Sequence, residues 1–286
     1  MNFDLNKIII ALGNLPGIGK AKIRRIVNEM EIDQMEYDEL IKLLKNKFTN
    51  LDLSNLKNYL TEAKKLIEKS LENSITIINY KDKQFPKSLN VIKNPPNLIF
   101  VRGSERILQD ENKNIAVIGT RKPSDEGYQM AFDVAQHLTK KGFNIVSGLA
   151  SGCDTQAHKG CLAKNGLTIA VMPCGLNKVY PKSNHKLAKD ILEKGGALIS
   201  EYLPDESTKP FKFVERDRLQ SGLSKEVILI ESDLDGGSMK TINFAKEQNK
   251  KIKIFFPSIF TNITLGNKKL INEKNLNFKK VDEINL

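Results

Sequence analysis

Short apolar runs alternate with amphipathic helical stretches over the second half of the chain. The runs are mainly apolar and show no alternation of polar and apolar residues, which is typical of strands in a parallel sheet covered on both faces. Most of the helical stretches end at a glycine, the residue that closes helices in the left-handed conformation. The pattern predicts strands at 115–118, 144–147, 168–172, 197–200, 226–231 and 252–256, and helices at 125–141, 154–165, 184–194, 214–223 and 238–249. We therefore expect an α/β fold, a doubly wound, Rossmann-like domain with a mostly parallel sheet.

The first part of the chain predicts a small all-helical domain. The apolar run Leu5–Leu12 is followed by amphipathic stretches at 36–48 and 54–72. Two short strand patterns, at 75–78 and 98–101, then indicate a connecting segment that packs on the main domain. The predicted division is a helical domain at 1–72, a connecting segment at 73–112 and the Rossmann-like domain with its tail at 113–286.

A glycine-rich turn, Pro16-Gly17-Ile18-Gly19, joins the first two predicted helices. It resembles a helix-hairpin-helix, in which the backbone N–H groups of such a turn bind a phosphate. Gly17, Gly19, Lys20 and Lys22 are therefore candidate secondary DNA contacts. The alternative is a corner between two helices whose glycines only permit close packing. The sequence does not decide between the two.

Three loops rich in small residues follow predicted strands and precede predicted helices. They are Gly119-Thr120-Arg121, the segment from Ser147 to Gly152, and Asp235-Gly236-Gly237-Ser238. Ligands of such folds bind at the carboxyl ends of the strands, where loop amides and helix N-termini offer partial positive charge to phosphate. None of the loops carries G-x-G-x-x-G or the P-loop pattern. We expect a phosphate site whose ligand need not be a mononucleotide.

Charge and composition narrow the class of partner. The chain holds 45 Lys and Arg against 34 Asp and Glu, a net charge of +11. A basic protein without a membrane-spanning run most often binds a polyanion, and nucleic acid is the commonest one. We expect no signal peptide and a cytoplasmic location. The three cysteines have no C-x-x-C spacing, so neither a disulfide framework nor a metal site is predicted.

Several polar residues near the loops have simple structural explanations. Asp154 suits a helix N-cap, and His158, one turn later, is expected to be structural. Arg121 could reach over a phosphate with its planar fork, or pair with a nearby carboxylate such as Glu126. Glu201 follows a strand but has no second carboxylate or nucleophile at a fixed spacing, so catalysis is not predicted.

The segment from Lys209 to Arg218 mixes cations with two phenylalanines. Such a mixture offers phosphate contacts beside rings on which a base can stack. The alternative is that both phenylalanines belong to the core.

These motifs together resemble the DNA-processing protein A (DprA/Smf) family over nearly the whole chain. The most specific of them is S-G-x-A-x-G-x-D-x-x-A-H, which runs in full from Ser147 to His158. The family's other motifs G-[ST]-R, Y-P-x-x-N-x-x-L, S-E-Y and G-N-x-x-L-I match Gly119-Thr120-Arg121, Tyr180-Pro181 with Asn184 and Leu187, Ser200-Glu201-Tyr202, and Gly266-Asn267 with Leu270-Ile271.

The resemblance implies binding of single-stranded DNA, a homodimer formed through the Rossmann-like domain, and delivery of the strand to a RecA-type recombinase in natural transformation and recombination. It implies neither catalytic turnover nor a cofactor. The nucleic-acid-binding residues that it implies are Gly119, Thr120, Arg121, Ser147, Gly148, Ser151, Gly152, Lys209, Lys212, Phe213, Arg216, Arg218, Gly236, Gly237 and Ser238.

The chain departs from the family pattern at several positions. Asp217 stands in the usual R-N-R, and an aspartate beside phosphate is unfavourable unless an arginine pairs with it. Gly236-Gly237-Ser238 replaces S-G-[ST], and Ser258 replaces the glycine of P-G. We also expect no C-terminal winged-helix module.

A nucleotide-binding sensor or a nucleotide hydrolase of a specialised system, for example in defence, is the alternative. Related Rossmann-like hydrolases carry P-G-G-x-G-T-x-x-E, whose glutamate position here holds Asn243 or Phe244.

Overall fold

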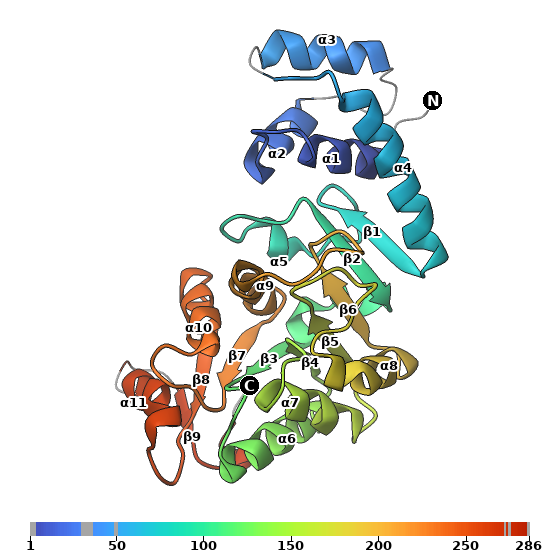
Figure 1. Ribbon diagram of the computed structural model, residues 1–286. Helices are drawn as coiled ribbons and strands as arrows, with labels where there is room; N and C mark the ends of the chain where they lie inside the picture. The colour runs from blue at the N-terminus through green and yellow to red at the C-terminus, as the bar shows by residue number, and fades with distance from the viewer. Residues whose placement is uncertain (1–3, 30–36, 49–50, 272, 274–275, 285–286) are drawn as a thin grey trace.

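The centre of the computed structural model, which describes residues 4–29, 37–48, 51–271, 273 and 276–284, is a nine-stranded sheet (Figure 1). Its order is β1-β2-β6-β5-β4-β3-β7-β8-β9. Neighbours from β6 to β9 in this order pair in parallel, while β1 and β2 form an antiparallel edge. The strands are β1 Ile75–Asn79, β2 Leu98–Gly103, β3 Asn114–Ile118, β4 Asn144–Ser147, β5 Thr168–Val171, β6 Ala197–Ser200, β7 Glu226–Leu229, β8 Lys251–Phe255 and β9 Leu276–Phe278. The predicted α/β fold with a mostly parallel sheet is confirmed.

Helices cover both faces of the sheet, which is why its strands are apolar on both sides. In β3, Ile115 and Val117 pack with α6 and α7, whereas Ala116 and Ile118 pack with α9, α10 and α11. The helices are α1 Leu5–Gly13, α2 Lys20–Asn28, α3 Tyr37–Lys47, α4 Leu56–Glu72, α5 Lys87–Asn90, α6 Asp125–Lys140, α7 Cys153–Leu162, α8 His185–Glu193, α9 Pro210–Gly222, α10 Gly237–Glu247 and α11 Leu265–Ile271.

The N-terminal helices α1 to α4 form a small helical region beyond the β1–β2 edge (Figure 1). Helices α1 and α4 pack against β1, and one apolar cluster joins Leu12 and Leu60 to Ile77 and Phe100 of the edge strands. The segment that links the helical region to β3 therefore contributes two strands to the sheet. The domain boundaries given above stay a prediction.

The largest differences from the predicted helix bounds are at the start of α9 and at the end of α7, which ends at Leu162 instead of 165. Helix α9 begins at Pro210 instead of 214, because proline suits the first helical position, where its missing N–H is not needed. After α7 the left-handed residue is Asn165, with φ of 54°, and not Gly166. Asparagine tolerates this conformation better than most side chains.

None of the helices in the described residues is long and apolar enough to cross a membrane. The three cysteines are free and buried.

Candidate nucleic-acid interface

A cavity of about 350 Å³ opens at the carboxyl ends of the central strands. The chain passes from β3 to β4 on one side, while β7 joins the other side of β3, so the cavity lies where the strand order reverses. This is the position at which open α/β sheets bind ligands. Its lining residues are Ile118, Gly119, Thr120, Arg121, Ala150, Asp154, Phe213, Val214, Arg216, Asp217, Gln220, Asp233, Gly236, Gly237, Ser238 and Thr241.

The cavity brings together about half of the residues predicted from the sequence. Those that line it are Gly119, Thr120, Arg121, Phe213, Arg216, Gly236, Gly237 and Ser238. The remaining predicted residues, which are not part of its lining, are Ser147, Gly148, Ser151, Gly152, Lys209, Lys212 and Arg218.

Arg121 is the exposed cation of the cavity. Its guanidinium lies 5.1 Å from the centre of the Phe213 ring. Among the residues that the structure describes, no carboxylate lies within ion-pair distance of it. Glu126, the predicted alternative partner, instead accepts hydrogen bonds from the backbone N–H and the hydroxyl of Ser258. Arg121 is therefore available to an anion that enters the cavity.

Glycines allow the loops after β3 and β4 to approach each other closely. Gly152 has φ of +74°, and a Cβ there would lie 2.5 Å from the carbonyl oxygen of Thr120. A Cβ on Gly148 would lie 1.8 Å from Nη1 of Arg216. Ser147 is buried behind the loop, and its hydroxyl donates to the Val117 carbonyl at 2.7 Å. These residues lie behind the lining and allow the two loops to pack together, while Ser151 is exposed on the loop surface.

The three helix N-termini near the cavity differ in how their amides are satisfied. At α6, the Ser124 hydroxyl accepts from the Gly127 N–H, and Ser124 itself donates to buried Glu231. Beside α7, the Asp154 carboxylate accepts from the amides of Gly148 and Ala150 at 3.1 and 3.3 Å. The N-cap of α7 is Gly152, and not Asp154 as predicted from the sequence. The Asp154 carboxylate instead binds the backbone of the loop before the helix.

Helix α10 begins without a comparable partner. It has no acidic residue in its first turn, and its N-cap, Gly236, makes no side-chain hydrogen bond. Asp233 lines the mouth beside Gly236, but no hydrogen bond from the first amides of α10 to its carboxylate is present among the described residues. The α10 N-terminus therefore presents free N–H groups and the positive end of the helix dipole to the cavity.

Arg216 and Asp217 form a buried pair in the cavity wall. The Arg216 Nε lies 3.1 Å from Asp217 Oδ1, and its Nη1 donates to the Val171 carbonyl at 2.7 Å. Burial raises the pKa of Asp217 to about 7, although Arg216 and Arg121 oppose the rise. Burial also raises the pKa of Asp154, again opposed by Arg216. An arginine thus pairs with the aspartate that departs from the family motif.

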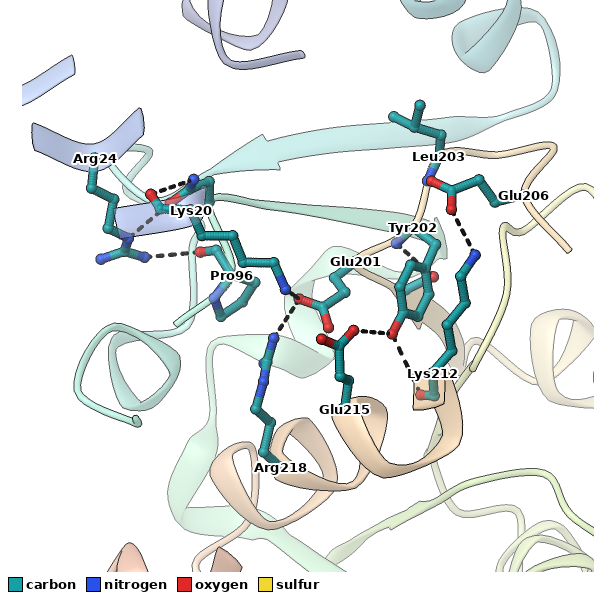
Figure 2. A network of polar contacts seen from close by, with 12 residues as sticks. Lys20, Arg24, Pro96, Glu201, Tyr202, Leu203, Glu206, Lys212, Glu215 and Arg218 are labelled. Carbon is teal, nitrogen blue, oxygen red and sulfur yellow. Dashed lines mark hydrogen bonds and ion pairs between the residues drawn. The ribbon is translucent and has the colours of Figure 1, made fainter. Parts of the chain in front are cut away.

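Lys212 and Arg218 belong to a polar network that is separate from the cavity lining (Figure 2). Lys212 Nζ lies 2.6 Å from Glu206 Oε2, and Arg218 Nη2 lies 2.5 Å from Glu201 Oε2. Each of the two cations has only 4% of its side chain exposed. Lys209 is the exposed N-cap of α9.

The same network attaches the helical region to the body. Lys20 Nζ lies 3.0 Å from Glu201 Oε2, and Arg24 donates to the Pro96 carbonyl at 2.8 Å (Figure 2). Gly17 and Gly19 are exposed in the turn before α2, and Gly17 has φ of +77°. Of the candidate secondary contacts, Lys22 has no carboxylate partner in the part of the chain that the structure describes.

His158 is completely buried and is not part of the cavity lining. Its Nδ1 lies 2.7 Å from Thr168 Oγ1, and burial together with nearby Arg216 lowers its pKa to about 3. Its environment fits the structural role expected from the sequence.

Sequence reasoning missed several lining residues. Val214 lies within the segment 209–218 but was not one of the predicted residues, and Gln220 and Thr241 follow predicted residues by two and three positions in α9 and α10. Their signal was helical spacing, since Phe213, Arg216 and Gln220 recur at intervals of three or four residues. Asp233 carries no comparable signal, because only the fold places its loop at the cavity mouth.

The chain is similar to known proteins over most of its length. The family model "DNA recombination-mediator protein A" matches residues 76–285. Protein Smf of Escherichia coli is 35% identical over 208 residues, which is 71% of this chain and 55% of that protein. The chain thus spans about half the length of the curated relatives that it matches first.

Two solved structures resemble the whole fold and the main domain, respectively. DNA processing protein A from Streptococcus pneumoniae superposes with a TM-score of 0.78 and 26% identity, covering 99% of this chain and 97% of that one. DNA processing protein A from Helicobacter pylori, solved for its single-stranded DNA binding mode, gives a TM-score of 0.65 and 30% identity over 73% of this chain and 92% of that one.

Proposed function

The chain belongs to the DNA recombination-mediator protein A family, and from this premise we propose that it binds single-stranded DNA in the cavity at the carboxyl ends of β3, β4 and β7. The observation that carries the proposal is the placement of Arg121. Its unpaired guanidinium lies over the Phe213 ring and lines the same cavity as the open N-terminus of α10.

Each part of this arrangement suits one part of a nucleotide. A phosphate between Arg121 and the amides of Gly237 and Ser238 receives bidentate and backbone hydrogen bonds in a partly enclosed space. A neighbouring base stacks on the exposed side of Phe213, and stacking on a ring tolerates any base. Binding of this kind is independent of sequence and selective for unpaired strands.

The proposal extends to how the protein works. It binds the strand as a homodimer without chemical change and presents it to a RecA-type recombinase during transformation or recombination. Support for a binding role over catalysis comes from the carboxylates of the cavity wall. Two of the three carboxylates that line the cavity are engaged by groups of the protein itself, Asp154 by backbone amides and Asp217 by Arg216.

Fluorescence anisotropy of a labelled single strand at several salt concentrations tests the proposal, with a duplex as control. We expect affinity to fall with salt at a log–log slope of about −0.7 per neutralised phosphate. Loss of the Arg121 contact in Arg121→Ala should weaken binding about 30-fold, as expected for a charge-assisted pair worth ~2 kcal/mol. Lys164→Ala is the control, because it also removes one positive charge but at an exposed position beyond the end of α7.

Two results would contradict the proposal. One is salt-independent binding, and the other is an Arg121→Ala variant that binds as well as the Lys164→Ala variant. Competition by a nucleoside monophosphate at similar affinity, or release of free base from it, would instead favour the nucleotide sensor or hydrolase.

A further inference from the structure

A second hollow lies beside the cavity, between α2 of the helical region and the pair formed by α9 and α10. Its volume is about 1090 Å³. We call it the α2–α9 groove, and the residues used below are Lys20, Lys22, Phe211, Val214, Arg218 and Phe244. Val214 lines the cavity as well as the groove, so the two spaces adjoin.

Helix α9 separates the two spaces by presenting a different face to each. Phe213, Arg216 and Gln220 face the cavity, and Phe211 and Arg218 face the groove. The first set is spaced by three and four residues and the second by seven, and each spacing keeps side chains on one helix face. Helix α10 packs on α9 and contributes Phe244 to the groove. A strand that leaves the cavity across Val214 therefore enters the groove.

The charge of the groove suits a polyanion. Its lining includes the cations Lys20, Lys22, Arg24 and Arg218 and one carboxylate, Glu215. Lys20 and Arg218 share a second carboxylate, Glu201, from outside the lining, so four cations face two carboxylates. The Glu215 carboxylate accepts a hydrogen bond from the Tyr202 hydroxyl at 2.8 Å (Figure 2). The excess of positive charge favours a nucleic-acid backbone.

Two independent observations point to an anion at one end of the groove. The first is the N-terminus of α2, whose N-cap Gly19 makes no side-chain hydrogen bond and whose first turn has no acidic residue. The second is Arg218, which lines the groove with 4% of its side chain exposed. Its Nη1 is buried without a hydrogen-bond partner among the described residues. Free backbone amides and an unsatisfied guanidinium N–H are hydrogen-bond donors that the oxygens of an anion such as phosphate can satisfy.

The apolar part of the groove suits bases. Phe211 has 54% of its surface exposed, and no other ring packs against it in the described residues. Phe244 lies on the same lining, half-buried. Exposed rings within a basic groove are the usual platform for unpaired bases.

We propose that the α2–α9 groove binds the nucleotides next to the one held in the cavity, with a phosphate at the N-terminus of α2 and a base against Phe211. The helical region then forms part of the DNA site, and the glycine-rich turn before α2 has a phosphate-binding role. The inference rests on the proposed function of the cavity.

Oligothymidylates of two lengths test the inference, one of roughly 3 nucleotides that fills only the cavity and one of roughly 12 that also crosses the groove. Phe211→Ala should weaken binding of the longer strand about tenfold, since stacking on a ring contributes that much per base. Lys22→Ala should reduce the salt slope for the longer strand by about 0.7. Neither variant should change binding of the short strand.

Matched variants separate the groove from general effects. Phe211→Tyr keeps a ring and should bind like the wild type, whereas Lys164→Ala removes a charge away from the groove and should leave both strands unaffected. If the wild type binds both strands and the groove variants match it, the groove inference is overturned while the cavity proposal stands. If the wild type binds neither strand, the proposed function itself fails.

Discussion

The N-termini of α7 and α10 begin after loops of similar composition, yet they differ in what their surroundings offer a ligand. Beside α7, the Asp154 carboxylate accepts the amides of Gly148 and Ala150. At α10, the amides after Gly236 face the cavity with no side-chain cap. The first arrangement stabilises the loop and the second leaves room for phosphate. Small residues after a strand therefore predict a site only where the protein does not fill it with its own carboxylate.

The largest expected effect on DNA affinity comes from giving the N-terminus of α10 a carboxylate, as the loop at α7 has in Asp154. Ser238→Asp places a carboxylate in the first turn of α10, where it competes for the free amides and repels phosphate. We expect strand affinity to fall about 100-fold. The unfolding free energy should rise by about 0.5 kcal/mol, because acidic residues stabilise helix N-termini. Anisotropy and urea denaturation measure the two effects.

Ser238→Ala is the control for this variant, because it removes the 2.8 Å hydrogen bond to the Ser232 hydroxyl without adding charge. It should bind within a few-fold of the wild type. Equal affinities for the aspartate variant and the wild type would mean that the α10 amides take no part in binding.

The opposite change removes the carboxylate that fills the loop at α7. Asp154→Ala leaves two backbone N–H groups without their acceptor and removes a charge that faces Arg216. We expect the unfolding free energy to fall by about 2–3 kcal/mol. Asp154→Asn keeps an acceptor oxygen and should lose less. Urea midpoints measure both, and an unchanged midpoint for the alanine variant would show that the loop does not depend on this carboxylate.

The fold and the edge of the sheet that carries the cavity were predictable from sequence because both depend on local patterns. Apolar runs located the strands from β1 to β8 but not the short edge strand β9, and the loop after β3 placed Arg121 at the carboxyl ends of the strands, where the cavity lies. The pattern could not separate Arg216 from Arg218, because two residues along a helix turn a side chain to another face and the sequence does not say which face is covered. It equally could not show that Lys212 and Arg218 are buried, since their partners Glu206 and Glu201 come from the segment after β6.

The smallest expected effect concerns Asp217, whose carboxyl group lies near both arginines and a second carboxylate of the cavity wall. Its pKa is raised from 3.8 to about 7 by burial, with Asp154 adding to the rise and Arg216 and Arg121 opposing it. A folded pKa above the unfolded one means that the native state holds the proton more tightly, so this group's contribution to stability decreases as the pH rises from about 4 to about 7.

Strand binding should depend on pH in the same direction. Below pH ~7 the protonated Asp217 adds no negative charge beside a bound phosphate, and above it the carboxylate repels the strand. We expect wild-type affinity to be a few-fold higher at pH ~6 than at pH ~8. Asp217→Asn is neutral at both values, so its affinity should match the wild type's low-pH value and vary less across the range. Anisotropy at constant ionic strength measures this. A variant that retains the full pH dependence would assign the titration to Asp154 instead, whose pKa burial also raises.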